Sequence, residues 1–499
     1  MQREFLRSSF RLLLLTSLFS ASTVYEAAHI SALSSNDVWW HLRTGLWTLQ
    51  NHSIPRTGLF SQYPNLPWND SSWGYEALLA TAYKLLGLRA LPILLMGFKA
   101  ALAVVTFRLA RAGRANFWTA IFLSAVAQYV IPWLQPLPYA FSILFFAVEL
   151  QLLVHSRQTG TAKNLFWLPV LFVFWANLHI QFVAGLILLG VFVIALLLEK
   201  VLRKLRVSRL SERILPLDLR QAGIVSVLSL LGTFVNPYTV HLLPAAFKVL
   251  YSPVAFDHFT EMSAMSFRRP QEFVLMLLVM TAFLALGRRR SLELFELMTL
   301  VAGTLVAFRI ERDGWLVVLP AIAVLSGGLQ FGRTESELPR SGGFAWERAW
   351  AAGLTVAVVV IAAACVPGSN VLMKKISDYF PVKACDYILA NRLRQPLFNA
   401  YSWGGFLTWY LPQYPVAVDS RIELYGDDIL GSYFNVVGGK QLLESDPMVA
   451  HAGTLLLERQ SAMAKALTNL PALSARYRLA YSDGLASVFV PQPSPQPNQ

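Results

Sequence analysis

The chain alternates between long apolar runs and short polar connections over most of its length. The Pro, Gly and charged residues that end these runs predict about eleven membrane spans. Several runs are short for a full bilayer, which predicts tilted or broken helices. Residues 73–87 have the pattern of an additional amphipathic helix that lies at the membrane interface. The spans are expected near residues 10–30, 88–110, 116–131, 138–155, 164–178, 182–199, 221–236, 271–287, 292–308, 313–330 and 347–366.

The pattern changes after residue 366. "PLFNAYSWGGFLTWYL" and "YPVAVDSRIELYG" predict strands around a Gly-Gly turn, and "AGTLLLE" and "RYRLAYSDGLASVFVP" predict strands that flank a helix at "SAMAKALTNL". The expected fold is therefore an all-α polytopic transmembrane bundle with a C-terminal extracytoplasmic α/β domain. The predicted domains are residues 1–366, with an external loop at 34–87, residues 367–490, and a disordered tail at 491–499.

Composition agrees with a membrane protein. Of 499 residues, 55% are hydrophobic and only 14% are charged. Cys365 and Cys385 are too few for a disulfide framework and are interpreted as two unrelated thiols. Arg3, Arg7 and Arg11 stand before an apolar core as they would in a signal peptide. We favour an uncleaved anchor there, because many later spans already commit the chain to the membrane.

The net charge of +13 is explained by topology. If the N-terminus is cytoplasmic, the cytoplasmic loops include residues 108–114, 155–163, 199–220 and 287–291, and each of them is basic. That is what the positive-inside rule requires. The loop at 34–87 and the C-terminal domain are then external, and no nucleic-acid partner is predicted.

The stretch "SSNDVWWHLRTG", residues 34–45, follows the first span directly. Asp37 lies where water meets lipid and could act as a general base toward a polar acceptor. The alternative is that Asp37 caps the helix that begins there. Trp39 and Trp40 are interpreted either as interface anchors or as sugar platforms.

Further along the same loop, Asp70 and Glu76 lie on either side of Trp73. Together with Asp37 they could supply a base and a ligand for a divalent cation such as Mg²⁺ or Mn²⁺. Helix capping and solvation are the alternative, and capping is favoured for Asp70. No cofactor is required by the sequence itself.

Two histidines lie in other external turns. His179 in "WANLHIQ" is at membrane depth, where a histidine facing a cavity is a functional candidate, although Asn177 or Gln181 could satisfy it locally. His241 follows Asn236-Pro237 in "FVNPYTVHLL", where proline predicts a helix end.

A third external turn, "RIERDG", crowds Arg309 and Arg312 with Glu311 and Asp313. Arginine suits a phosphate through bidentate bonding, and mutual ion pairing is the alternative. The sequence has no phosphate loop, nucleophile elbow or paired-cysteine metal site, which disfavours a nucleotide-driven pump.

Four stretches together resemble a large group of bacterial polytopic membrane proteins described as GT-C-type glycosyltransferases. These are "NDVWWHLRTGLWTLQNHSIPRTGLFS…PWNDSSWGYEALL", "WANLHIQFVAGL", "NPYTVHLL" and "FNAYSWGGFLTWYLPQYPVAVDSRIELYG", in the same order. The resemblance implies a transferase of the bacterial inner membrane that uses a polyprenyl-phosphate-linked sugar. Its acceptor would be a glycan, lipid or protein on the extracytoplasmic face.

In such enzymes an acidic residue at the start of the first external loop acts as base. The resemblance gives that role to Asp37, and after it to Asp70 or Glu76. His41 or Arg43 would then stabilise the departing phosphate. The predicted substrate-binding residues are His41, Arg43, Trp73, His179, His241, Arg309 and Arg312.

The chain departs from the group at two places. Members commonly carry an Arg-Pro-Gln-like element before the fourth span, where "LQPLPYAFS" keeps Gln135 and Pro136 but has no arginine. Ser420 replaces a usual glycine in "DSRIELYG". The first departure puts a phosphate contact there in question.

Other functions compete with a lipid-phosphate-sugar transferase. One is a related membrane enzyme on polyprenyl-linked glycans, such as a polymerase or ligase. Another is a non-enzymatic transporter or envelope-assembly scaffold. A transporter should place ionisable residues in mid-span and show repeated halves. The polar residues are here read as lying at external span ends, without an internal repeat, which favours an enzyme.

Overall fold

The computed structural model describes residues 2–131, 134–205, 217–250, 252–289, 291, 293–329, 344–443 and 446–492. Contacts divide the chain into two compact units. The membrane unit comprises Met1–Ser31, Pro92–Leu243 and Phe259–Val366, and the mixed unit comprises Ala32–Leu91, Pro244–His258 and Pro367–Gln499.

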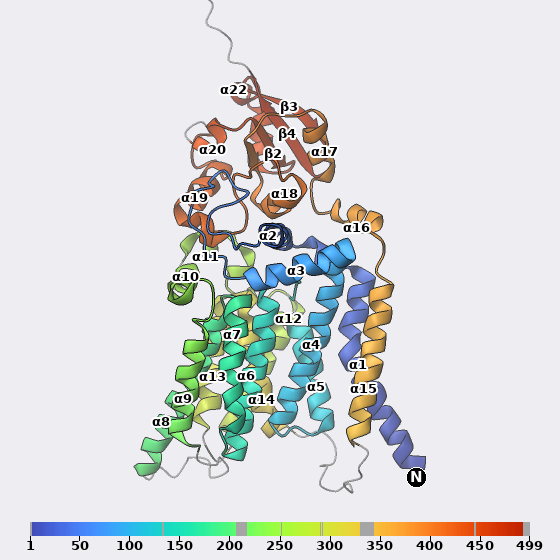
Figure 1. Ribbon diagram of the computed structural model, residues 1–499, viewed down its shortest axis with the longest axis vertical. Coiled ribbons are helices and arrows are strands. Elements are labelled where there is room, and N and C mark those ends of the chain that lie inside the picture. The colour runs from blue at the N-terminus through green and yellow to red at the C-terminus, as the bar shows by residue number, and fades with distance from the viewer. Residues whose placement is uncertain are drawn as a thin grey trace, which may run out of the picture. The chain divides into compact units, whose positions relative to one another are not determined.

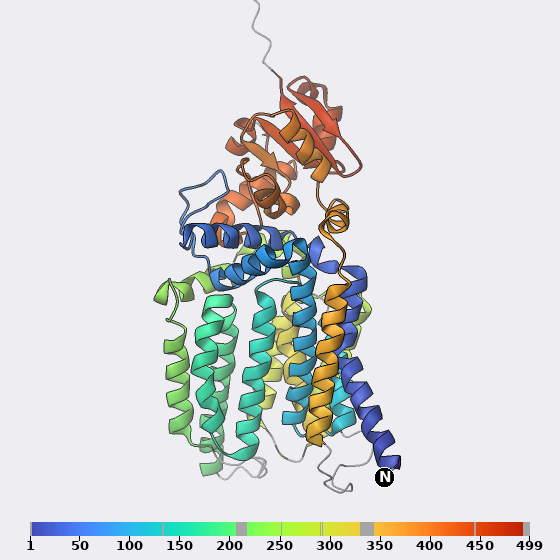
Figure 2. The same ribbon diagram turned by 45° about the vertical axis from the view of Figure 1, so that its right-hand side comes forward.

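A helix lies over every segment that the hydrophobic pattern predicts as a span, and Figures 1 and 2 show these helices side by side. Short 3₁₀ helices η3 (Lys163–Trp167), η4 (Thr239–His241), η5 (Thr260–Met262) and η6 (Glu311–Gly314) lie in the connections. The long helices are α1 (Gln2–His29), α4 (Ala90–Ala112), α5 (Phe117–Val130), α6 (Tyr139–Thr159), α7 (Leu168–Leu178), α8 (Phe182–Lys204), α9 (Leu219–Gly232), α12 (Pro270–Gly287), α13 (Leu294–Arg309), α14 (Trp315–Gly328) and α15 (Phe344–Ala364).

Among the described residues, fewer helices than the predicted eleven have the length and hydropathy of a full span. Within the described residues, four helical segments are long and apolar enough to cross a membrane, or five if α15 is joined with α16 (Ser369–Ile376). The four are Trp73–Ala112, α6, α8 and α12. Helices α5, α7 and α9 are apolar but shorter than a bilayer needs. The chain is a multi-pass membrane protein.

The membrane unit is held together by close helix contacts and by paired charges. Helix α1 packs against α15, and α14 packs against α5, α6, α12 and α13. At Gly303 a side-chain Cβ would come within 2.3 Å of the Leu316 carbonyl oxygen, so only glycine lets α13 approach α14 this closely. Lys99 Nζ lies 2.7 Å from the buried Glu26 carboxylate, which offsets the cost of burying that charge.

The mixed unit combines short helices with one small sheet. Its helices are α2 (Asp37–Asn51), α3 (Trp73–Leu86), α10 (Leu242–Leu250), α11 (Pro253–His258), α16, α17 (Val382–Ala390), α18 (Gly404–Tyr410), α19 (Ile422–Val437), α20 (Pro447–Ala450), α21 (Ala462–Asn469) and α22 (Pro471–Ser474). The 3₁₀ helices are η1 (Ser31–Ser34), η2 (Gly87–Arg89) and η8 (Tyr401–Trp403), and the strands are β1 (Leu397–Asn399), β2 (Thr454–Glu458), β3 (Tyr477–Ser482) and β4 (Ala486–Pro491). The helix predicted over residues 73–87 is confirmed as α3.

The strands form a four-stranded sheet in the order β1-β2-β4-β3. Strand β1 runs parallel to β2, with Leu397 opposite Thr454, and the other pairs are antiparallel. The predicted strands in "AGTLLLE" and "RYRLAYSDGLASVFVP", and the helix between them, are confirmed.

The predicted strands around the Gly-Gly turn are wrong. Beyond the three residues of β1, the segment forms η8 and the helix α18, and "RIELYG" begins the helix α19. The two glycines permit close packing within the unit. A Cβ on Gly404 would lie 2.2 Å from the Val418 carbonyl oxygen, and one on Gly405 would lie 2.3 Å from that of Asn36.

The interpretation of Trp39 as an interface anchor or sugar platform is also wrong, because its side chain is fully buried. Its ring lies 5.6 Å from that of Phe406 and 4.7 Å from that of Trp409, both on α18. Trp40 is 7% exposed. Both tryptophans therefore join the first loop to the C-terminal segment, which confirms that this segment packs on the loop.

Three remaining expectations concern ends, loops and thiols. Most of the loop predicted at 199–220, namely residues 206–216, lies outside the described residues, as does most of the tail predicted at 491–499, namely 493–499. Pro491 belongs to β4, so that tail was predicted to begin too early. Cys365 and Cys385 are both free, which confirms two unrelated thiols.

Candidate functional site

The predicted site residues fall into two groups, one in each unit, and each group is described by itself. The mixed unit holds Asp37, His41, Arg43, Asp70, Trp73 and Glu76. The membrane unit holds His179, His241, Arg309 and Arg312.

Asp37 is the first residue of α2 and is half-buried. It does not cap the helix, because the N-cap position belongs to Asn36. The Asn36 side chain is itself used elsewhere, since its Oδ1 accepts a hydrogen bond from Phe406 N at 3.3 Å. A carboxylate in the first turn is favoured by the helix dipole. Asp37 is therefore an acidic residue of the first turn of α2, next to its N-cap residue.

One turn after Asp37 on the same helix, His41 contacts a buried carboxyl pair. His41 Nδ1 lies 2.8 Å from Glu76 Oε1, and the buried Asp70 carboxyl group interacts with that of Glu76. Burial raises the pKa of Asp70 to about 6, against the opposing effect of a hydrogen bond from Ser72 N.

These two carboxyl groups are also shielded from solvent. Asp70 is 1% exposed and Glu76 is fully buried, whereas Asp37 is half-buried. The structure brings Asp70, Glu76 and His41 together. Since an acceptor must reach the base, Asp37 is the accessible carboxylate of the predicted three.

The sequence pattern missed the second half of this buried cluster, in "DSRIELYG". Arg421 is fully buried, and its Nη2 lies 2.6 Å from Asp419 Oδ2, which also accepts from the Tyr425 hydroxyl at 3.0 Å. Burial lowers the pKa of Arg421, but the charge and hydrogen bonds of Asp419 outweigh this and raise it. The guanidinium lies 4.9 Å from the Trp68 ring centroid, and Trp68 Nε1 donates to Glu423 Oε1 at 3.3 Å.

Ser420, which replaces the usual glycine, forms a hydrogen bond in this cluster. Its hydroxyl oxygen accepts a hydrogen bond from Trp40 Nε1 at 3.1 Å. Both this segment, residues 419–425, and the helix α18 therefore contact α2. The whole arrangement fixes the helix that carries Asp37.

Arg43 and Trp73 lie at the edge of this cluster. The Arg43 guanidinium lies 4.8 Å from the Phe60 ring centroid, and partial burial lowers its pKa. Trp73 is half-buried at the start of α3. The ring of Phe60 offers Arg43 a cation–π contact, which leaves its polar edge with capacity to donate hydrogen bonds.

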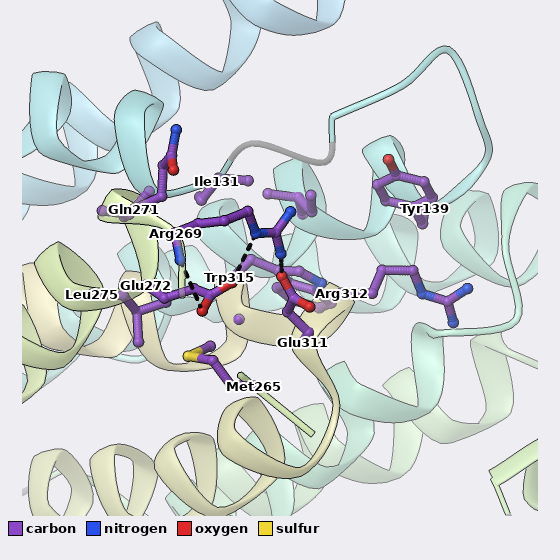
Figure 3. A pocket seen from close by; sticks show the side chains of 13 residues that line it. Ile131, Tyr139, Met265, Arg269, Gln271, Glu272, Leu275, Glu311, Arg312 and Trp315 are labelled. Atoms are coloured by element: carbon purple, nitrogen blue, oxygen red, sulfur yellow. Dashed lines mark hydrogen bonds and ion pairs between the residues drawn. The ribbon is translucent and has the colours of Figure 1, made fainter. Parts of the chain in front are cut away.

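The membrane unit contains a pocket where α12, η6 and α14 meet the chain between α5 and α6 (Figure 3). One part of its wall is apolar and another is polar. The apolar part comprises Val130, Ile131, Ile143, Met265, Leu275 and Trp315. The polar part comprises Tyr139, Arg269, Gln271, Glu272, Glu311 and Arg312.

The two arginines of the pocket are held differently. Arg269 lies between two carboxylates, since its Nε is 2.8 Å from Glu272 Oε1 and its Nη2 contacts Glu311 (Figure 3). Arg312 points away from that pair, and its ion pair with the half-exposed Glu261 is long, at 3.8 Å. Glu311 instead pairs with Arg269, and Asp313 accepts a hydrogen bond from Gln181. Arg312 is therefore the better placed of the two to meet an anion.

Arg269 is a residue that the sequence reasoning missed. It precedes Pro270 and Gln271, and this Arg-Pro-Gln tripeptide starts α12 with proline at a position that needs no N–H donor. No arginine stands beside Gln135 and Pro136, but Arg269 contributes an arginine to the pocket from a different part of the chain. The tripeptide itself, just before a predicted span, was the signal.

His179 lies at the end of α7, and its Nδ1 is 2.8 Å from the Ser142 hydroxyl, which also accepts from Trp175 Nε1 at 2.7 Å. Burial and the charge of Arg312 lower the pKa of His179 to about 3, so the imidazole is neutral at physiological pH. The neighbours suggested by the sequence have other partners. Asn177 donates to backbone carbonyls, and Gln181 donates to Asp313 Oδ1 at 2.9 Å.

His241 and Arg309 do not line this pocket. Both are exposed, His241 in η4 and Arg309 at the last position of α13. Helix α9 ends at Gly232, before Asn236-Pro237, which confirms the predicted helix end. Asn236 then stabilises the turn, because its Oδ1 accepts from Tyr238 N at 2.7 Å.

A divalent cation needs several oxygen or nitrogen ligands that converge. No group of three or more His, Cys, Asp or Glu side chains in the described part of the chain is arranged to hold one. Asp37, Asp70 and Glu76 as they stand do not fit such an ion, and no step below depends on one.

Comparisons with known proteins bear on the fold. No protein-family model and no curated protein sequence matches the chain. The oligosaccharyltransferase of Archaeoglobus fulgidus, tethered with an acceptor peptide containing the NVT sequon, matches with a TM-score of 0.54 at 12% identity, over 97% of this chain and 74% of that one. The same enzyme, AglB, in complex with an inhibitory peptide and a dolichol-phosphate, matches with a TM-score of 0.53 at 11% identity, over 94% and 72%.

The fold is GT-C-like. At these identities the likeness concerns the arrangement of helices along nearly the whole chain, and it extends into the C-terminal segment. It carries no information on individual residues. What the chain does must therefore be argued from its own side chains.

Proposed function

We propose that this protein is an integral-membrane glycosyltransferase that moves a sugar from a polyprenyl-phosphate donor to an extracytoplasmic acceptor. The observation that carries the proposal is the pocket of the membrane unit, which joins an apolar wall to Arg269 and Arg312. A phosphate on a long apolar chain needs both kinds of surface. The GT-C-like fold, matched to an enzyme whose structure contains a dolichol-phosphate, supports the same donor class.

In the proposed reaction Asp37 is the general base. It takes the proton of the acceptor hydroxyl as the acceptor oxygen bonds to the anomeric carbon of the sugar. The bond from that carbon to the phosphate oxygen breaks, and the polyprenyl phosphate leaves with the electron pair.

The buried cluster of the mixed unit would support this base without touching substrate. His41, Glu76 and Asp70 fix the α2 and α3 helices against each other, and Arg421 holds the C-terminal segment on them. From the basic loops predicted to be cytoplasmic, we infer that this unit is extracytoplasmic. The acceptor is then a glycan, lipid or protein outside the cell.

Binding of undecaprenyl phosphate to the purified protein in lipid nanodiscs tests the donor class. We expect it to bind at least about tenfold more tightly than undecaprenol, which lacks the phosphate, because charge-assisted hydrogen bonds to arginine favour the anion. Arg312→Ala should remove most of that preference.

Arg309→Ala is the matched control. Arg309 lies three residues before Arg312, is exposed, and is not among the residues that line the pocket. Its loss should leave the preference for the phosphate unchanged. Equal affinity for the phosphate and the alcohol, or equal effects of the two substitutions, would contradict the proposal.

A transporter is the alternative that one observation favours. Glu149 lies in the middle of α6 and is fully buried, which is the mid-span ionisable residue that the sequence reasoning did not register. Uptake or release of a polyprenyl-linked substrate by vesicles, without any transfer to an acceptor, would favour this reading over the transferase.

A further inference from the structure

Glu149 occupies an unusual position in the membrane unit. It lies ten residues from either end of α6 (Tyr139–Thr159), one of the helices long and apolar enough to cross a membrane. At a rise of about 1.5 Å per residue, that is about 15 Å from each end of the helix. Its side chain is fully buried. It therefore lies far from water in both directions along the helix.

The surroundings of the Glu149 carboxyl group are apolar. Neither of its oxygens has a hydrogen-bond partner within the described part of the chain. The group lies against Gly185 of α8 and the ring of Trp175, since a Cβ on Gly185 would come within 2.7 Å of Glu149 Oε2 and 2.5 Å of Trp175 Cζ3. The absent side chain at Gly185 is what makes room for the carboxyl group.

No charged group compensates Glu149. Its principal neighbours are η3, α7, α8 and α14, and the sequences of α7 and α14 contain no charged residue. On α8 the first charged residue, Glu199, comes fourteen positions after Gly185, about 21 Å along the helix. Besides Glu149, the charged or titratable residues of α6 and these neighbours are Tyr139, His155, Arg157, Lys163, Glu199, Lys200, Arg203 and Lys204, with His179 just beyond α7.

An ionised carboxylate in such a place is far more costly than a neutral acid, because neither water nor a counter-charge is present. Glu199 in the same unit is instead paired with a cation, because its carboxylate accepts two hydrogen bonds from Arg157 at 2.5 and 2.7 Å. A metal ion at Glu149 would need several further oxygen ligands. A glycine and an indole ring do not supply them.

A polar chain leads from this region toward the pocket. Trp175, whose ring packs over Gly185, donates through Nε1 to Ser142, and Ser142 contacts His179 Nδ1 at 2.8 Å. Ser142 lies seven residues before Glu149, and both are buried on one face of α6. His179 in turn feels the charge of Arg312, a lining residue of the pocket.

We propose that Glu149 is a proton-binding site inside the membrane unit. The step adds one proton from water to the Glu149 carboxylate and forms one O–H bond; release reverses it. The site does not depend on the transferase function, because its geometry involves no donor or acceptor.

Infrared difference spectroscopy of the full-length protein in lipid at pH 7 tests the protonation directly. We expect the spectrum of the wild type minus that of Glu149→Gln to contain the carbonyl stretch of a protonated carboxyl group. Glu199→Gln is the matched control, and its difference spectrum should contain only carboxylate bands, because Glu199 is paired with Arg157. A Glu149 difference spectrum without the carbonyl stretch would overturn the proposal.

Labelling with dicyclohexylcarbodiimide, which reacts with protonated carboxyl groups in apolar surroundings, gives a second readout. Mass spectrometry should find Glu149 modified at least about tenfold more than Glu199, since each pH unit of difference changes a protonated fraction about tenfold. Added Na⁺ should not alter the infrared band. Loss of the band on addition of Na⁺ would show that the site binds a cation instead of a proton, and equal labelling of the two glutamates would also overturn the proposal.

Discussion

The protein buries ionisable groups in two opposite ways, one in a cluster of the mixed unit and the other at Glu149 of the membrane unit. In the mixed unit, Arg421, Asp419, Asp70, Glu76 and His41 belong to one cluster in which each has a partner. In the membrane unit, Glu149 is buried without any partner in the described part of the chain. The first arrangement joins segments that are hundreds of residues apart in sequence.

This difference distinguishes two roles of buried ionisable groups. A shared cluster specifies which segments dock, because every group left without its partner is costly. A buried acid without a partner does not determine which segments pack together, and its burial is tolerated only when the carboxyl group is neutral. We therefore expect substitutions in the cluster to change stability strongly and a substitution at Glu149 to change it little.

The largest effect is expected for Arg421→Met. It leaves Asp419 buried without its cation, and breaking a buried ion pair in this way costs about 3–5 kcal/mol in the free energy of unfolding. Replacing both partners, as Asp419→Asn with Arg421→Met, should restore part of that loss. Thermal unfolding of the detergent-solubilised protein measures both. Arg478→Met, at an exposed position of β3, is the control, and an equal shift in all three variants would contradict the cluster.

A smaller effect is expected at Asp70, and it depends on pH. Its pKa rises from 3.8 to about 6 on folding, so the folded state holds the proton more tightly than the unfolded state between these values. The free energy of unfolding should thus fall by up to roughly 3 kcal/mol as the pH rises through this window. Asp70→Asn should flatten that part of the profile, while the exposed Asp378→Asn should not. A fall that survives in Asp70→Asn would contradict the assignment.

The smallest effect is expected for Glu149→Gln. A neutral acid and an amide have nearly the same shape and neither carries a charge, so the exchange should change the free energy of unfolding little. Glu199→Gln should cost clearly more, because it leaves Arg157 buried without its carboxylate. Thermal unfolding of the two variants side by side makes the comparison within one unit. Equal losses would show that Glu149 is a charged, partnered group.

Much of the fold follows from the hydrophobic pattern, and particular errors show where the pattern fails. Periodicity locates the helices, because each must bury an apolar face over many residues. The stretch "GGFLTWYL" is too short and too uniformly buried for its period to distinguish a strand from a helix, and it forms α18. The close approach of its glycines to Asn36 and Asp419 depends on residues far away in the chain.

Only part of the candidate site could be predicted from the sequence, because the rest depends on contacts between distant segments. The three carboxylates that lie close together in loop 34–87, Asp37, Asp70 and Glu76, could be identified from the sequence. Arg421 and Asp419 join this cluster only through tertiary contacts. Arg269 and Glu149 could have been found, the first from Arg-Pro-Gln before a span and the second as a single acid in an apolar run. Which arginine of a turn faces the pocket, Arg309 or Arg312, is decided by packing alone.

The central claim is that Asp37 is the base of a lipid-phosphate-sugar transferase. The most direct measurement is the rate of sugar transfer by Asp37→Asn, from a polyprenyl-phosphate sugar that the wild type uses, with thermal unfolding recorded on the same preparation. Asparagine keeps the size of aspartate but cannot take a proton, so we expect the rate to fall by about 10²–10⁴ with unfolding close to that of the wild type. A variant that retains more than about a tenth of the wild-type rate would contradict the claim.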